Sequence, residues 1–246
     1  MSNLYNDLAE VYEAMYATFI DYKLEYELYE SFLDKFNKKK LLEIGCGTGS
    51  LAKHFIRNNY EYCGLDMSAD MLKIAKEKNP NTPFVQGDMR SFKLANQIES
   101  VLITGRTISY LVENNHVLSS FKCIHNVLTE KGLFCFDFID ANEFIPYVNK
   151  TNSITHKAEF KNKNYIRKSI WEPNILSNWH LNWSSTYYEE QQGNLIEIGK
   201  DSAKVRAFTK DEILLFLNLT NFKVNDIFKR KTYAFPTYMV IAEKVI

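Results

Sequence analysis

The sequence predicts an α/β fold: a mostly parallel sheet flanked by helices, with an antiparallel, β-rich insert after the fifth strand. From Lys40 onward, short apolar runs alternate with helix-type segments, which is typical of stacked βαβ units. Between residues 153 and 208 the helical pattern is absent, and strand-type runs follow one another between turn signals. The helical pattern then returns, and two closing strands bring the sheet to seven.

The first five strands and the helices between them follow from hydrophobic periodicity. The strands are KLLEIG (40–45), YEYCGLD (60–66), TPFVQGD (82–88), residues 98–104 and GLFCFDFI (132–139). Helices are expected over residues 50–58, over SADMLKIAKEK (68–78) with Ser68 as N-cap, and over residues 115–129. Gly132 is expected to separate the last helix from the fifth strand.

The remaining segments complete the domain. A helix over residues 209–219 opens with a capping box of Thr209 and Glu212, and the closing strands are FKVNDIFK (222–229) and TYMVIAEKV (237–245). In the 153–208 insert, strict alternation places Trp179, Leu181, Trp183, Ser185 and Tyr187 on one face, which the core or a bound substrate must cover. Residues 1–36 form a tyrosine-rich helical segment, either a helix laid over the sheet or a lid over a ligand.

Composition bounds the classes of partner. With 246 residues and 46% hydrophobic residues, we expect one domain over 1–246, as a monomer or homodimer. Basic and acidic residues both number 30, so no overall field attracts nucleic acid or an anionic membrane. The apolar runs are too short to span a bilayer. The four cysteines lack disulfide or metal spacing and no leader pattern opens the chain, which fits a cytoplasmic protein with reduced thiols.

Three glycines, Gly45, Gly47 and Gly49, lie between the first strand and its helix. Such a turn allows close backbone approach to a ligand and favours an anionic group at the helix start. Two ligand classes compete: a dinucleotide pyrophosphate and the amino-acid carboxylate of S-adenosylmethionine. The dinucleotide pattern G-x-G-x-x-G/A fails from Gly45 because Ser50 takes the third place, and fits from Gly47 only two residues late.

Three acids at successive strand ends favour S-adenosylmethionine. Glu43 would repel a pyrophosphate but attract the ammonium of a methionine moiety. Asp66 is placed for ribose hydroxyls, which both ligand classes carry. Asp88 is placed to accept from an adenine amino group, with Met89 against the ring. The set suits an adenosyl sulfonium and suits a pyrophosphate poorly.

These stretches resemble class I S-adenosylmethionine-dependent methyltransferases, a Rossmann-like fold, through EIGCGTG, GLDMSADML and QGDM. YNDLAEVYEAMY, SYL, FDF and the late insert resemble the small-molecule group that includes bacterial sugar-amine N,N-dimethyltransferases. The resemblance implies S-adenosylmethionine as cofactor and S-adenosylhomocysteine as product. It implies a cofactor site lined by Tyr16, Glu43, Gly45, Cys46, Gly47, Asp66, Met67, Asp88, Met89 and Gly105. Where relatives commonly carry a small, acidic or apolar residue after strand four, this chain has Arg106, so substrate charge does not carry over.

Methyl transfer from a sulfonium is an in-line displacement that depends chiefly on alignment and needs no covalent residue. No N/D-P-P-Y/F motif follows strand four, which disfavours amines of nucleic-acid bases or of protein glutamine. A neutral amine attacks unaided, whereas a hydroxyl requires a base, for which Tyr110, Asp140 or a histidine are candidates. The histidines are His54, His116, His125, His156 and His180. Candidate substrate contacts are Tyr12, Tyr22, Arg106, Tyr110 and Trp183.

Three readings stay open at the level of single motifs. Arg106 either pairs with a substrate carboxylate or phosphate or forms a structural ion pair. The basic run from Lys157 to Lys168 either contacts an anionic polymer or is a solvated strand edge. Asp137, Asp140 and Asn142 either hold a metal or end the strand, and we predict no metal site.

The leading hypothesis is a methyltransferase that acts on a small-molecule acceptor, at an amine. Its first alternative is O- or carboxyl-methylation of a small metabolite. An NAD-linked oxidoreductase that uses the loop from Gly47 onward is the second, and a catalytically idle cofactor-binding protein is the third.

Overall fold

Buried apolar runs form the central sheet of the protein. The computed structural model describes residues 9–174, 179–231 and 237–245. Seven strands lie in the order β10-β11-β5-β4-β1-β2-β3. They are β1 (Lys40–Ile44), β2 (Glu61–Asp66), β3 (Phe84–Gln86), β4 (Ile98–Ile103), β5 (Leu128–Ile139), β10 (Phe222–Arg230) and β11 (Thr237–Lys244). Strands β1 to β5 pair in parallel, whereas β11 is antiparallel to both β5 and β10.

Alternation along the strands explains why helices cover both faces of this sheet. Leu41 packs in a cluster with α2 (Tyr22–Lys35), α3 (Ala52–Arg57) and α4 (Ala69–Lys78). The next residue, Leu42, packs on the opposite face with α5 (Asn114–Val127) and α7 (Lys210–Leu219). A strand buried on both faces is mostly apolar, and the last four residues of β1 are all buried, with Glu43 as the exception to their apolar character. The parallel sheet and its flanking helices are as predicted.

Local capping sets several helix boundaries. Ser68 accepts from the Met71 N–H at the start of α4, and Thr209 and Glu212 form the predicted capping box of α7. One expectation was wrong and one helix was missed. Gly132 lies inside β5, because the strand already begins at Leu128 and bulges where Lys131 has a φ of 54°. A helix that was not predicted, α6 (Ala141–Lys150), follows β5.

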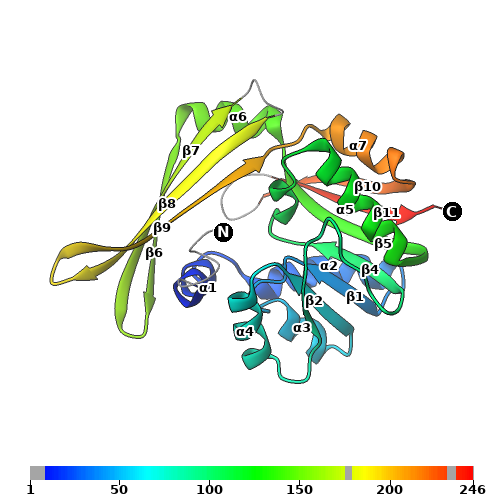
Figure 1. Ribbon diagram of the computed structural model, residues 1–246, viewed down its shortest axis with the longest axis horizontal. Coiled ribbons are helices and arrows are strands. Elements are labelled where there is room, and N and C mark those ends of the chain that lie inside the picture. The colour runs from blue at the N-terminus through cyan, green and yellow to red at the C-terminus, as the bar shows by residue number, and fades with distance from the viewer. Residues whose placement is uncertain (1–8, 175–178, 232–236, 246) are drawn as a thin grey trace.

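The segment after α6 forms a second, four-stranded antiparallel sheet in the order β6-β7-β8-β9 (Figure 1). Its strands are β6 (Ser153–Phe160), β7 (Lys163–Asn174), β8 (His180–Gln191) and β9 (Asn194–Arg206). Leu181, Trp183, Ser185 and Tyr187 are buried on one face, as the alternation predicts. Residues 175–178 of the predicted insert lie outside the described residues, and Trp179 precedes β8.

Two buried side chains join this insert to the core. The Arg206 side chain, 1% exposed, donates to Asn114 Oδ1 and to Glu212 Oε1, both at 2.7 Å. The His180 Nε2 donates to the Val112 carbonyl at 2.8 Å. Because Val112 and Asn114 follow the short 3₁₀ helix η2 (Thr107–Tyr110), the insert and this segment of the core are held at a fixed separation.

Helix α1 (Ala9–Ala17) lies between the insert and the core (Figure 1). Its Met15 is fully buried against Ala158 and Tyr165 of the insert. On the core side, Glu13 accepts from Ser50 Oγ at 3.2 Å and forms an ion pair with Lys78. Residues 1–8 of the predicted N-terminal segment lie outside the described residues.

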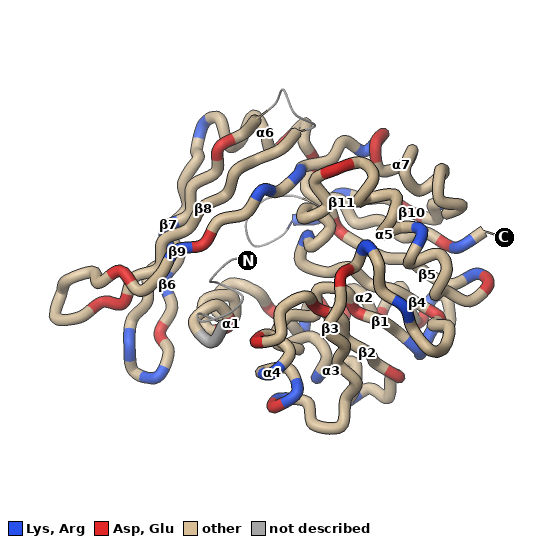
Figure 2. The backbone as a smooth tube through the Cα atoms, in the orientation of Figure 1, with Lys and Arg blue, Asp and Glu red and all other residues tan. Residues whose placement is uncertain are grey.

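The surface carries charges of both signs. Figure 2 shows Lys and Arg interspersed with Asp and Glu over both sheets. Within the described ranges, no helix has the length and apolar character needed to cross a membrane.

Candidate active site

The glycine loop begins at the carboxyl end of β1. Gly45, Gly47 and Gly49 all have positive φ, at 74°, 52° and 69°, which residues other than glycine rarely adopt. A Cβ on Gly45 would lie 2.5 Å from Thr107 Cγ2, so this glycine allows η2 to approach the loop. A Cβ on Gly47 would meet nothing within 4 Å, so this part of the backbone borders open space.

The loop is less available to an anion than its sequence suggests. The Gly45 N–H donates to the Leu65 carbonyl at 2.7 Å, and the Gly47 N–H donates to Asp66 Oδ2 at 2.9 Å. Helix α3 has six residues, so its dipole is short. The glycines therefore provide close approach to the cavity, and the N–H groups of Gly45 and Gly47 serve the loop itself.

Glu43 is 2% exposed and accepts hydrogen bonds from two hydroxyl groups. The Tyr62 hydroxyl donates at 2.6 Å and the Thr104 hydroxyl at 2.8 Å. Burial raises the pKa of Glu43 to about 7, although both hydroxyls favour the carboxylate. A cationic group beside Glu43 would restore its full negative charge.

Asp66 connects the glycine loop to α4. Its carboxylate accepts from the N–H groups of Gly47 and Ser68, both at 2.9 Å. Burial raises its pKa, and these backbone hydrogen bonds oppose the rise. Asp66 thus fixes the loop while it also lines the cavity.

Asp88 pairs with a neighbour that the sequence analysis did not consider. The Arg90 Nε lies 2.9 Å from both carboxylate oxygens, and this arginine lowers the pKa of Asp88 below its usual value. Since a carboxylate has further lone pairs, it still accepts from a ligand amino group. The adjacent Met89 is largely buried, whereas Met67 is exposed.

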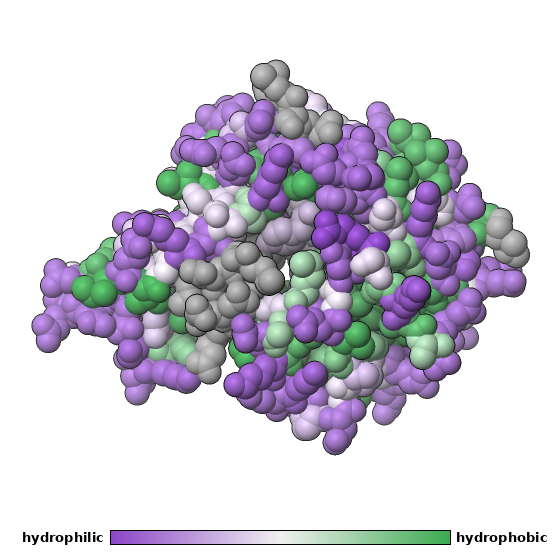
Figure 3. Space-filling model, in the orientation of Figure 1, coloured by the Kyte–Doolittle hydropathy of each residue, from purple (hydrophilic) through white to green (hydrophobic). Residues whose placement is uncertain are grey.

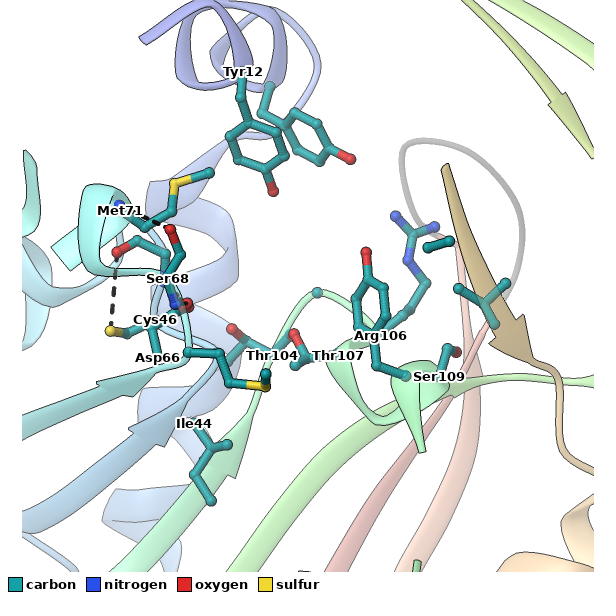
Figure 4. Close-up of a pocket in the computed structure, with 18 of the residues that line it drawn as sticks. Tyr12, Ile44, Cys46, Asp66, Ser68, Met71, Thr104, Arg106, Thr107 and Ser109 are labelled. Atoms are coloured by element: carbon teal, nitrogen blue, oxygen red, sulfur yellow. Dashed lines mark hydrogen bonds between the residues drawn. The ribbon is translucent and has the colours of Figure 1, made fainter. Parts of the chain in front are cut away.

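All these groups line one cavity of about 560 Å³, within the usual range for small-molecule sites. Figure 3 shows the surface hollowed between the insert and the core. In Figure 4, Tyr12 points into the space that separates Cys46 and Asp66 from Arg106 and Ser109. The cavity brings together the predicted cofactor residues Tyr16, Glu43, Gly45, Cys46, Gly47, Asp66, Met67, Asp88, Met89 and Gly105. It also includes the predicted acceptor residues Tyr12, Tyr22, Arg106, Tyr110 and Trp183.

One candidate base lies elsewhere. Asp140 caps α6 by accepting from the Asn142 N–H, and it is not among the residues that line the cavity. Of the five histidines, His156 alone among the described residues lines it.

One wall of the cavity is formed by β6 and β7 and consists of Ile154, His156, Arg167, Ser169 and Trp171. His156 was a candidate base, whereas the other four were not predicted from the sequence. Strand pairing places Arg167 opposite Tyr187, Ser169 opposite Ser185, and Trp171 opposite Trp183. The available signal was the register between β7 and β8, since alternation was considered only in β8. The solvated-edge interpretation of the basic run from Lys157 to Lys168 is wrong for Arg167, which is 5% exposed.

Comparison with known families bears on this site. Residues 41–132, from β1 through the bulge of β5, match the family described as a methyltransferase domain. This stretch therefore resembles a methyltransferase domain. The matched stretch contains Glu43, the glycine loop, Asp66 and Asp88.

Two relatives are similar to parts of this chain. The dTDP-3-amino-3,4,6-trideoxy-alpha-D-glucopyranose N,N-dimethyltransferase of Streptomyces venezuelae is 37% identical over 71 residues, 29% of this chain and 30% of the relative. An uncharacterized methyltransferase of Alkaliphilus oremlandii is 32% identical over 109 residues, 41% of this chain and 50% of the relative. The chain spans about half, or less, of the length of the curated relatives it matches.

A solved structure extends the likeness of fold to the whole chain. The S-adenosylmethionine-bound amino pentose methyltransferase CalS10 of Micromonospora echinaspora superposes with a TM-score of 0.77 at 16% identity. The match covers 96% of this chain and 97% of that one. The fold is that of class I S-adenosylmethionine-dependent methyltransferases, with the sheet insert after β5.

Proposed function

We propose that this protein is an S-adenosylmethionine-dependent methyltransferase acting on an amine of a small-molecule acceptor. The observation that carries the proposal is the single cavity that joins Glu43, Asp66 and Asp88 at the sheet edge to an aromatic wall of the insert. Such a cavity holds two ligands side by side. The named relatives, which methylate amino sugars or bind this cofactor, support the same assignment.

Each of the three acids binds a different part of the cofactor. Glu43 binds the methionine ammonium, Asp66 accepts from the ribose hydroxyls, and Asp88 accepts from the adenine amino group, with Met67 and Met89 beside the ring. When bound, the cofactor supplies a methyl group on a sulfonium. After the transfer, the rest of the cofactor leaves as a neutral thioether. The protein aligns the acceptor with that methyl group and excludes water.

The state of His156 favours an amine over a hydroxyl acceptor. Its Nδ1 accepts from Arg167 Nη2 at 3.0 Å, so in the neutral ring the proton resides on Nε2. Burial lowers the pKa of His156 to about 4. Its Nε2 therefore donates a hydrogen bond and does not remove a proton, and an amine attacks without such a base.

Two measurements test the proposal. Calorimetry with S-adenosylhomocysteine should show one site per chain, and a cofactor with a deuterated methyl group should label amines in a small-molecule extract. Absence of S-adenosylhomocysteine binding, together with thermal stabilisation by NAD, would favour the oxidoreductase alternative. Label on hydroxyl or carboxyl groups would favour the O-methylation alternative. Binding without any labelled product would indicate the catalytically idle alternative.

Three predictions remain as stated from the sequence: a cytoplasmic location, a monomer or homodimer, and lid roles for residues 1–36 and 153–208.

A further inference from the structure

Arg167 is a buried cation that has no acidic partner among the residues described by the structure. It lies on the inner face of β7, is 5% exposed and lines the cavity. Among the described residues, no carboxylate lies within 4.0 Å of its guanidinium nitrogens, whereas Arg90, Arg206 and Arg230 all form such pairs. A buried charge with no counter-charge is costly, because water no longer solvates it.

The neighbours of Arg167 give its guanidinium group uncharged contacts and leave two of its three nitrogens, Nε and Nη1, without a hydrogen bond of good geometry among the described residues. The guanidinium carbon lies 5.1 Å from the centroid of the Tyr16 ring and 5.8 Å from that of Phe19, within the range of cation–π contacts. The third nitrogen, Nη2, donates to His156. The hydroxyls of Tyr16 and Tyr187 lie beside the group, and burial raises the pKa of Tyr187.

Arg167 lies on a different part of the fold from Glu43 and Asp66, the acids proposed to bind the cofactor. Glu43 and Asp66 lie at the carboxyl ends of β1 and β2, whereas Arg167 lies on the insert, between Tyr16 of α1 and Tyr187 of β8. The hydrogen-bonded pair Ser169 and Ser185, at 2.6 Å, continues the polar surface along the same face.

We propose that Arg167 binds an anionic group, a carboxylate or a phosphate, on the methyl acceptor. The inference rests on the proposed function and adds the substrate class: an amine that also carries an acid. Guanidinium N–H groups match the oxygens of both anions. The cation–π contact with Tyr16 and the hydrogen bond to His156 hold the guanidinium group in place before the ligand arrives.

The experiment titrates anions onto protein saturated with S-adenosylhomocysteine. The probes are glutarate, inorganic phosphate and pyrophosphate, each against chloride at equal ionic strength, and the readout is the unfolding temperature. We expect at least one probe to raise it by a few degrees in the wild-type protein. Arg167→Gln should abolish the rise and Arg167→Lys should reduce it. The exposed Arg57→Gln, outside the cavity, should behave as wild type. Glutarate or phosphate as the effective probe distinguishes a carboxylate from a phosphoryl acceptor.

Several results would overturn the inference. One such result is that no anion stabilises the wild-type protein more than chloride does. Another is that the unfolding temperature of the Arg167→Gln variant responds to the anions as that of the wild-type protein does. A loss of S-adenosylhomocysteine affinity of more than about tenfold in both Arg167 variants would assign the cation to the cofactor carboxylate. If Arg167→Gln does not fold, the wild-type titration and Arg167→Lys decide the question. Failure of S-adenosylhomocysteine to bind at all would instead count against the proposed function.

Discussion

Glu43 combines complete burial with two hydroxyl donors, and its pKa of about 7 has consequences for binding. The free protein holds this group partly protonated at neutral pH, whereas a bound ammonium requires the carboxylate. Affinity for S-adenosylhomocysteine should therefore fall as the pH drops through 7, by about tenfold between pH 8 and pH 6. Calorimetry across this range tests the effect, and Glu43→Gln should bind weakly with little pH dependence. An affinity that is independent of pH in the wild-type protein would contradict it.

Glu43 gives folding stability a pH dependence opposite to that of the cofactor affinity. Because the folded-state pKa lies above the ordinary value of 4.5, folding favours the protonated form. This contribution is complete below pH 4.5 and is lost as the pH rises through 7. Bound cofactor should reverse the trend, since it stabilises the ionised form.

Asp66 carries two backbone hydrogen bonds in addition to its proposed ribose contact. Asp66→Asn should weaken S-adenosylhomocysteine binding by about 1.5–3 kcal/mol, or roughly 10- to 150-fold, through loss of charged hydrogen bonds. The exposed Asp226→Asn on β10 is the matched control and should leave the affinity unchanged. Equal affinities for both variants would remove Asp66 from the cofactor site.

At the scale of elements, β8 presents Trp183 both to a packing cluster and to the cavity. Its ring centroid lies 6.0 Å from that of Trp171 on the neighbouring strand. Full truncation to alanine would remove about 3–5 kcal/mol of stability, so the milder Trp183→Phe is the informative change. We expect a higher KM for the acceptor and an S-adenosylhomocysteine affinity within about twofold of wild type. Tyr188→Phe, on the other face of β8, is the control, and parallel losses of both affinities would refute a specific role in the acceptor site.

The elements differ in how far the sequence predicts them. Glu43 and Asp66 end buried runs of their strands, and Asp88 follows the third, so spacing alone places them at one sheet edge. Arg167 was missed because both faces of β7 mix apolar and charged residues, with Ile166 and Ile170 on one face and Tyr165 and Trp171 on the other. Register with β8 decides the matter, and register depends on tertiary pairing. Helix α6 was missed because it contains Pro146 and opens with the turn-like Asp140.

At the scale of the whole molecule, α1 contacts both halves of the cavity wall. Glu13 reaches Ser50 and Lys78 on the core, and the same helix packs Met15 into the insert. Glu13→Gln should speed dissociation of S-adenosylhomocysteine by about two- to fivefold, since a partly exposed ion pair contributes about 0.5–1 kcal/mol. Stopped-flow fluorescence measures this rate, with the exposed Glu77→Gln on α4 as control. An unchanged rate would show that α1 does not retain the ligand.

The junction at Arg206 and His180 also bears on how new specificities arise in such a chain. These two side chains fasten the insert to the segment after η2, while the cofactor acids lie on other strands. The hairpins of residues 153–206 thus form a unit that His180 and Arg206 attach to the core. Grafting hairpins from another chain between α6 and α7, with both connector residues kept, should exchange the acceptor range and leave the cofactor end intact. The part of the chain that recognises the acceptor could then change during evolution independently of the part that binds the methyl donor.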